Sequence, residues 1–83
     1  MSSVLSPIWR ANRPSNDGRG FLALVTTHSG EFFRGAVCGE PRQTEQIWTL
    51  KLDLWEAKRN GGGPIGVSEE IAVPNIKDVE IEW

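Results

Sequence analysis

The sequence has one cysteine and one histidine in 83 residues, and it has no tyrosine. Because Cys38 is alone, no internal disulfide can form, which favours a reducing, cytoplasmic setting. His28 with Cys38 falls short of the three or four protein ligands that a zinc site needs. We therefore expect a reduced, buried Cys38, no disulfide and no metal.

Long apolar runs and a targeting segment are also missing. The opening stretch MSSVLSPIWRAN has no charged region followed by an apolar core, so it does not resemble a signal peptide. No apolar run approaches the roughly 18–20 residues that span a bilayer. These absences predict a cytoplasmic protein with no part in a membrane.

No motif for catalysis or cofactor binding is present. The Gly61–Gly63 run and Pro64 are not followed by the Lys-Ser/Thr pair of a phosphate loop, nor by a helical pattern. A nucleophilic Cys38 needs a neighbouring base, but counting back from the turn pairs His28 with Glu31 or Phe32, far from Cys38. We expect no enzymatic activity and no cofactor.

The formal charge is −2, which argues against a non-specific nucleic-acid binder. The charge is uneven, because residues 1–42 hold five arginines and three acidic residues, whereas residues 43–83 hold four basic and eight acidic ones. Arginine suits bidentate contacts with phosphate or carboxylate. The split is compatible with head-to-tail self-association, with anion contacts, or with chance.

The length and composition indicate one small globular domain over residues 1–83. Hydrophobic residues make up 39% and charged residues 24%, which is ordinary for a folded domain. A chain of this length has a thin core, so each large apolar residue matters. The four tryptophans suit either that core or an interaction surface.

Residues 21–39 organise the predicted fold as a β-hairpin. Two strands, at about residues 20–27 and 31–38, flank a turn that contains Gly30. Both faces of the first strand are apolar, which predicts a strand that is central in the sheet or covered on both sides. Gly35 lies in the middle of the second strand, which predicts a sharp bend or a close backbone approach.

The remaining chain is predicted as short strands and loops. The stretch from 46 to 56 alternates apolar and polar residues and predicts a half-buried strand, with Lys51 and Asp53 on the wet face. The other expected segments are a frayed N-terminus (1–7), an edge strand (7–11), two loops (12–20 and 39–45), a flexible glycine-rich loop (57–68), a strand (69–73), a 3₁₀ turn (74–78) and a last strand (79–83).

These elements resemble small SH3-like or Sm-like barrels. In the Sm1 pattern a turn glycine, an aromatic, a bend glycine and an aliphatic residue follow at fixed spacing, as Gly30, Phe33, Gly35 and Val37 do here. The resemblance implies a small five-stranded, mostly antiparallel, strongly bent barrel with a 3₁₀ turn before the last strand. The Asp and Asn of the Sm RNA pocket and its second, Arg-Gly or Lys-Gly, signature have no counterpart in this chain.

Two functional hypotheses follow. The first is a non-enzymatic interaction module that self-associates or docks on a protein partner through strand edges and exposed aromatics, with the last strand (79–83) as the favoured edge. The second is single-stranded nucleic-acid (RNA) binding through Phe32, Arg34, Trp55 and the arginines at 10, 13 and 19. Asp78, Glu80 and Glu82 are expected on a solvated face. The candidate partner-binding residues are Phe32, Arg34, Arg42, Trp55 and Trp83.

Overall fold

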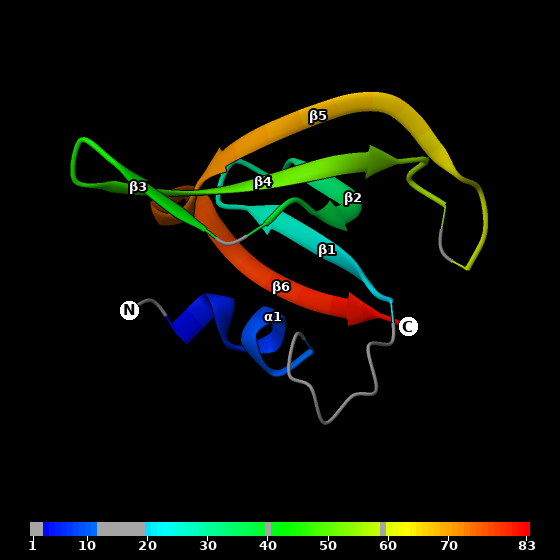
Figure 1. The fold of residues 1–83 in the computed structure, drawn as a ribbon, viewed down its shortest axis with the longest axis horizontal. Coiled ribbons are helices and arrows are strands. Elements are labelled where there is room, and N and C mark those ends of the chain that lie inside the picture. The colour runs from blue at the N-terminus through cyan, green and yellow to red at the C-terminus, as the bar shows by residue number, and fades with distance from the viewer. Residues whose placement is uncertain (1–2, 12–19, 40, 59) are drawn as a thin grey trace.

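The computed structural model describes residues 3–11, 20–39, 41–58 and 60–83, and in them the chain is predominantly β (Figure 1). A 3₁₀ turn and one short helix precede an antiparallel sheet, and a second 3₁₀ turn interrupts its last part. The elements are η1 (Ser3–Leu5), α1 (Ser6–Ala11), β1 (Leu22–Thr27), β2 (Phe32–Val37), β3 (Arg42–Thr44), β4 (Ile47–Trp55), β5 (Pro64–Ala72), η3 (Val73–Asn75) and β6 (Ile76–Glu82).

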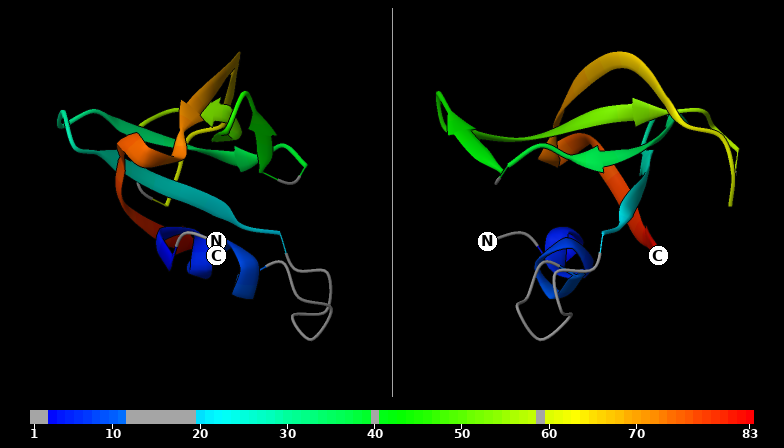
Figure 2. Two further views of the ribbon diagram at one scale, coloured as in Figure 1. Left: turned by 90° about the vertical axis from the view of Figure 1, so that its left-hand side faces the viewer. Right: turned by 45° about the vertical axis from the view of Figure 1, so that its right-hand side comes forward.

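The sheet has six strands, one more than the five expected. Its order is β3-β4-β2-β1-β6. β3 and β2 pair with successive parts of β4, and β5 also pairs with β4 but lies off this path. The sheet bends into an arch, with β5 on one side and β6 on the other (Figures 1 and 2). Within residues 60–83, β5 and β6 do not pair, so the expected barrel is not closed.

The core lies under the arch and depends on the strands that the sequence predicts best. β1 is central, between β2 and β6, and Ala23 and Val25 are fully buried. In β4, Leu50 and Leu52 are fully buried while Lys51 and Asp53 are exposed, as the alternation predicts. Phe33 and Val37 of β2 pack against the same core.

The N-terminal prediction is wrong for the described residues 3–11, which form η1 and α1 instead of a frayed end and an edge strand. Leu5, Ile8 and Ala11 are buried, and their three-residue spacing places them on one helical face. Pro7 is tolerated because it lies in the first turn. α1 fills the underside of the arch (Figure 2). The loop predicted over 12–20 lies, except for Gly20, outside the described residues.

Gly35 makes the close backbone approach that its position predicts. It pairs with Ala23 of β1 on one side and with Leu54 of β4 on the other. A Cβ atom at this position would overlap the carbonyl oxygen of Asp53. The bend between the hairpin and β4 therefore requires glycine at this residue.

The strands at residues 42–44 and 64–68 differ from the predicted loops. β3 pairs with the start of β4 across a two-residue turn in which Glu45 and Gln46 have φ of 48° and 72°. Such a turn normally carries Asn or Gly, so its sequence gives no hairpin signal. β5 begins at Pro64, earlier than predicted. Its register opposite Asp53 and Trp55 is irregular, and Gly66 in this part of the strand has a φ of 78°.

Candidate functional site

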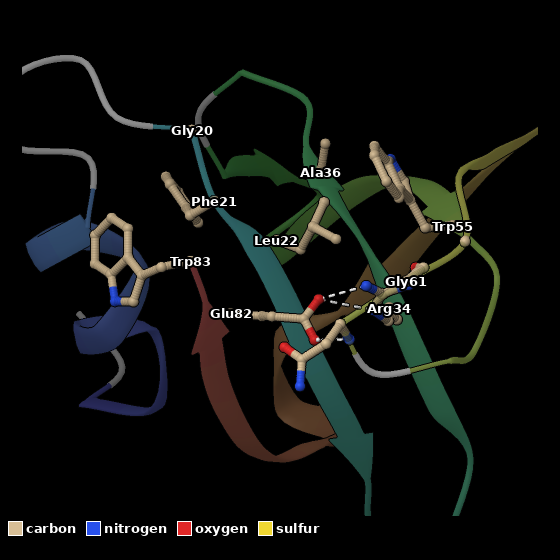
Figure 3. A pocket seen from close by; sticks show the side chains of 11 residues that line it. Gly20, Phe21, Leu22, Arg34, Ala36, Trp55, Gly61, Glu82 and Trp83 are labelled. Carbon is tan, nitrogen blue, oxygen red and sulfur yellow. Dashed lines mark hydrogen bonds and ion pairs between the residues drawn. The ribbon is translucent and has the colours of Figure 1, made fainter.

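Three of the five predicted partner-binding residues meet in one cleft. Arg34, Trp55 and Trp83 line it, although they lie on β2, at the end of β4 and directly after β6 (Figure 3). Phe32 lies at the start of β2 with 43% of its surface exposed and does not line the cleft. Arg42 is exposed on β3 and lines a different, polar pocket. The predicted group is therefore divided between separate surfaces.

Arg34, which both functional hypotheses treat as a contact residue, is buried. Only 3% of its surface is exposed. Its Nε donates to Oε1 of Glu82 at 2.9 Å, and Nη2 donates to the same oxygen. Its Nη1 donates to the carbonyl oxygens of Glu56 and Gly61 at 2.7 and 2.8 Å. This guanidinium thus ties the loop after β4 to the end of β6.

Glu82 is the partner of Arg34 and does not belong to a solvated acidic face. Arg34 and Glu82 meet across β1. Leu24 of β1 pairs with Arg34 of β2, and Leu22 of β1 pairs with Glu82 of β6. Residues directly opposite each other share a face of the sheet, so both charged side chains project over the same side of β1. Oε2 of Glu82 also accepts a hydrogen bond from the Asn60 backbone N–H at 3.0 Å.

The walls of the cleft are aromatic and aliphatic. The rings of Phe21 and Trp83 form a tilted pair with centroids 6.0 Å apart and planes at 58°. Trp55 lies across the cleft from this pair (Figure 3), and the guanidinium carbon of Arg34 is 5.9 Å from its ring centroid. Trp83 is 54% exposed, so its ring is accessible to a ligand. The cleft therefore combines the Arg34–Glu82 ion pair with aromatic side chains on its walls.

Sequence reasoning missed Phe21, Gly61 and Glu82 as parts of this cleft. Phe21 precedes β1 and reads as a strand residue, and Gly61 reads as part of a flexible connection. Glu82 alternates with apolar residues in the manner of an exposed position. Only the strand register, which brings residues 34 and 82 to either side of β1, identifies the pair.

Cys38 lies half-buried beside the second pocket, with Arg42, Thr49, Lys51 and Glu70. It is therefore not a core residue, contrary to the prediction. Partial burial raises the pKa of its thiol, and the nearby Asp53 carboxylate raises this pKa further. A thiol held in its protonated form is a poor nucleophile.

Metal-ligating groups do not gather in the described part of the chain. Within residues 3–11, 20–39, 41–58 and 60–83, no cluster of three or more histidine, cysteine or acidic side chains could hold a metal ion. Among the same residues, no helix has the length and apolar character to cross a membrane. His28 is exposed in the β1–β2 turn, where its backbone N–H donates to the Asn75 carbonyl oxygen at 2.8 Å.

Comparison with known proteins assigns the chain to no family. No protein-family model matches it. No curated protein and no solved structure matches it either. The function therefore has to be inferred from the fold and residues of the chain itself.

Proposed function

We propose that this chain is a non-enzymatic interaction module that self-associates or docks on a protein partner through the edge of β5. The observation that carries the proposal is the unpaired outer edge of β5. Among the described residues, β5 (Pro64–Ala72) pairs with β4 alone, through Pro64 and residues 68–72. Seven of its nine residues are exposed. An unpaired strand edge offers backbone donors and acceptors to an added strand.

Exposed apolar side chains on β5 support the same proposal. Ile65 and Val67 are 51% and 52% exposed. Edge strands that stay solitary are usually protected by charge or by irregular geometry. β5 has both features in part, because Glu69 and Glu70 are exposed and the register is irregular near Gly66. Ile65 and Val67 lie beside these protective features. Two exposed apolar residues at this position are compatible with an edge that a second chain covers.

The strand order supports the finer proposal that the fold is a small SH3-like or Sm-like barrel, open between β5 and β6. A strongly bent meander of β1, β2, β4, β5 and β6, with a 3₁₀ turn before the last strand, is the arrangement that the sequence resemblance implies. Its two terminal strands, β5 and β6, are the positions at which a further strand could add.

The chemistry of the side chains supports a non-enzymatic role and gives less support to RNA binding. Cys38 has a raised pKa, and His28 is exposed in a turn away from it. Arg34, the central residue of the RNA hypothesis, directs its hydrogen bonds to Glu82 and to two backbone carbonyls. A phosphate would therefore have to displace these internal partners.

Sedimentation equilibrium of the intact chain tests the proposal. We expect an apparent mass above the 9.2 kDa monomer that rises with concentration. Val67→Lys should return the mass to that of the monomer, because it places a charge in the covered edge. Ile47→Lys, at a comparably exposed residue of the β3–β4 hairpin, is the matched control and should leave association unchanged. A strict monomer at about 1 mM would remove the self-associating form of the proposal.

A further inference from the structure

The cleft that contains Arg34 has the volume of a small-molecule site. Its volume is about 620 Å³, within the range of roughly 300–1,000 Å³ that ligand pockets occupy. It is lined by residues 60–62 of the loop after β4, by the end of β6 and by the start of β1. Leu22 and Ala36 form an apolar surface between the aromatic walls (Figure 3). This site is distinct from the β5 edge that the proposed function uses.

The aromatic groups of the cleft are arranged on two opposing sides. Phe21 and Trp83 form one side, and Trp55 forms the other (Figure 3). Aromatic rings pair favourably with other rings in stacked or tilted geometry over centroid distances of about 4.5–7 Å. A planar group in the cleft can therefore pair with a ring on either side. An aliphatic group of the same size gains the apolar contact without the ring pairing.

Among the described residues that line the cleft, the two charged side chains are paired with each other. The Arg34 guanidinium and the Glu82 carboxylate neutralise each other, and the backbone carbonyls of Glu56 and Gly61 take two further N–H groups. Arg34 lies near the Trp55 ring, which disfavours a second cation at that face. An anion would have to compete with Glu82 for a guanidinium that is 3% exposed. The electrostatics thus favour an uncharged ligand.

We propose that this cleft binds an uncharged planar aromatic molecule, of the size of a fused bicyclic ring or larger, between Trp55 and the Phe21–Trp83 pair. The Arg34–Glu82 pair holds the loop at Asn60 and Gly61 against β6 at the base of this cleft. The proposal is independent of association at β5.

Indole is a suitable probe, and the tryptophans of the chain report its binding. In a ¹⁵N-labelled sample, each tryptophan contributes one indole N–H signal, assigned by single Trp→Phe variants. Unlabelled indole should shift the signals of Trp55 and Trp83 in a saturable manner. Trp48, which is 45% exposed outside the cleft, is the internal control and should not move. Cyclohexanol, benzoate and tetramethylammonium test aliphatic, anionic and cationic ligands.

Variants separate ring pairing from simple exposure. Trp55→Ala and Trp83→Ala should each weaken indole binding by about tenfold, whereas Trp83→Phe should retain most of it. Trp48→Ala should leave the affinity unchanged. The Val67→Lys background should bind indole with the affinity of the original chain, which separates this site from the β5 edge. Amide spectra confirm that each variant is folded.

Three results would overturn the proposal. One is the absence of a saturable shift at millimolar indole. Another is an equal response to cyclohexanol or to either charged probe, since the cleft would then not select neutral rings. The third is an equal loss of affinity in Trp48→Ala, because indole would then bind exposed tryptophans without preference.

Discussion

Beneath the arch of the sheet, α1 contributes Ile8 to the same apolar core as the fully buried Leu50 and Leu52. At the loop end of the same sheet, the buried group is the Arg34 guanidinium, whose partners are one carboxylate and two backbone carbonyls. The first region excludes water mainly with apolar side chains. The second region uses an ion pair to attach a glycine-rich loop that has little apolar surface of its own.

This sheet encloses a core although β5 and β6 do not pair with each other, and the difference between the two regions shows how. Apolar packing is non-directional and tolerates some adjustment of shape. A hydrogen-bonded ion pair is directional and fixes the loop in one place, but it is costly when one partner is lost. The two regions should therefore respond differently to substitution.

The largest effect is expected for Arg34→Gln. It leaves Glu82 without its counter-charge and removes donors from the carbonyls of Glu56 and Gly61. We expect the free energy of unfolding, measured by urea denaturation, to fall by about 4 kcal/mol. Arg42→Gln, at an exposed arginine, is the control and should change it by less than about 0.5 kcal/mol.

The double variant Arg34→Gln/Glu82→Gln, with Glu82→Gln alone, sharpens this result. Because it removes both charges together, it should be about 2 kcal/mol more stable than the sum of the two single effects predicts. Strict additivity in the double-mutant cycle would show that the two charges do not interact, and the contrast between the two regions would then fail.

A somewhat smaller effect is expected for Ile8→Ala in α1. The side chain is 2% exposed and touches the core, so its truncation should lower the free energy of unfolding by about 3 kcal/mol. Ile47→Ala makes the same chemical change at an exposed strand residue, and it should cost less than about 1 kcal/mol. Equal costs at the two sites would show that α1 does not cover the core.

The smallest effect concerns Cys38, which lies in neither region. Its raised pKa implies slow alkylation at pH 8, and the rate should rise with pH as the thiolate forms. Asp53→Asn removes a nearby negative charge, lowers the pKa and should speed alkylation by iodoacetamide about threefold at pH 8. Asp78→Asn on β6 should have no effect. Equal rates for Asp53→Asn and the original chain would contradict the assigned cause.

The strands β1, β2 and β4 could be predicted because alternation and a glycine turn encode them locally. The close approach at Gly35 could be predicted as well, because glycine weakens the middle of a strand and is typical of positions where a second backbone comes near. α1 was missed because a helix of six residues shows too little periodicity to distinguish it from a short strand. β3 was missed because Glu45 and Gln46 adopt left-handed conformations that their sequence does not signal.

Part of the candidate site could also be predicted from the local sequence. Arg34, Trp55 and Trp83 are an arginine and aromatics that a thin core need not absorb, and the fold brings them to one cleft. Their environment was not predictable, because the partner of Arg34 lies 48 residues further along the chain. Which charges meet depends on strand register, and no local pattern contains that register.

The pairing of β1 with β6 has a consequence for the order in which the protein matures during synthesis. β1 joins Leu22 to Glu82 and Thr27 to Ile76, so the central strand gains its second neighbour only after residue 82 has left the ribosome. Until then, β1 has one open edge and the Arg34 guanidinium has no counter-ion. Contacts between such distant residues slow folding, so the pairing of β1 with β6 is expected to form after the local β1–β2 hairpin.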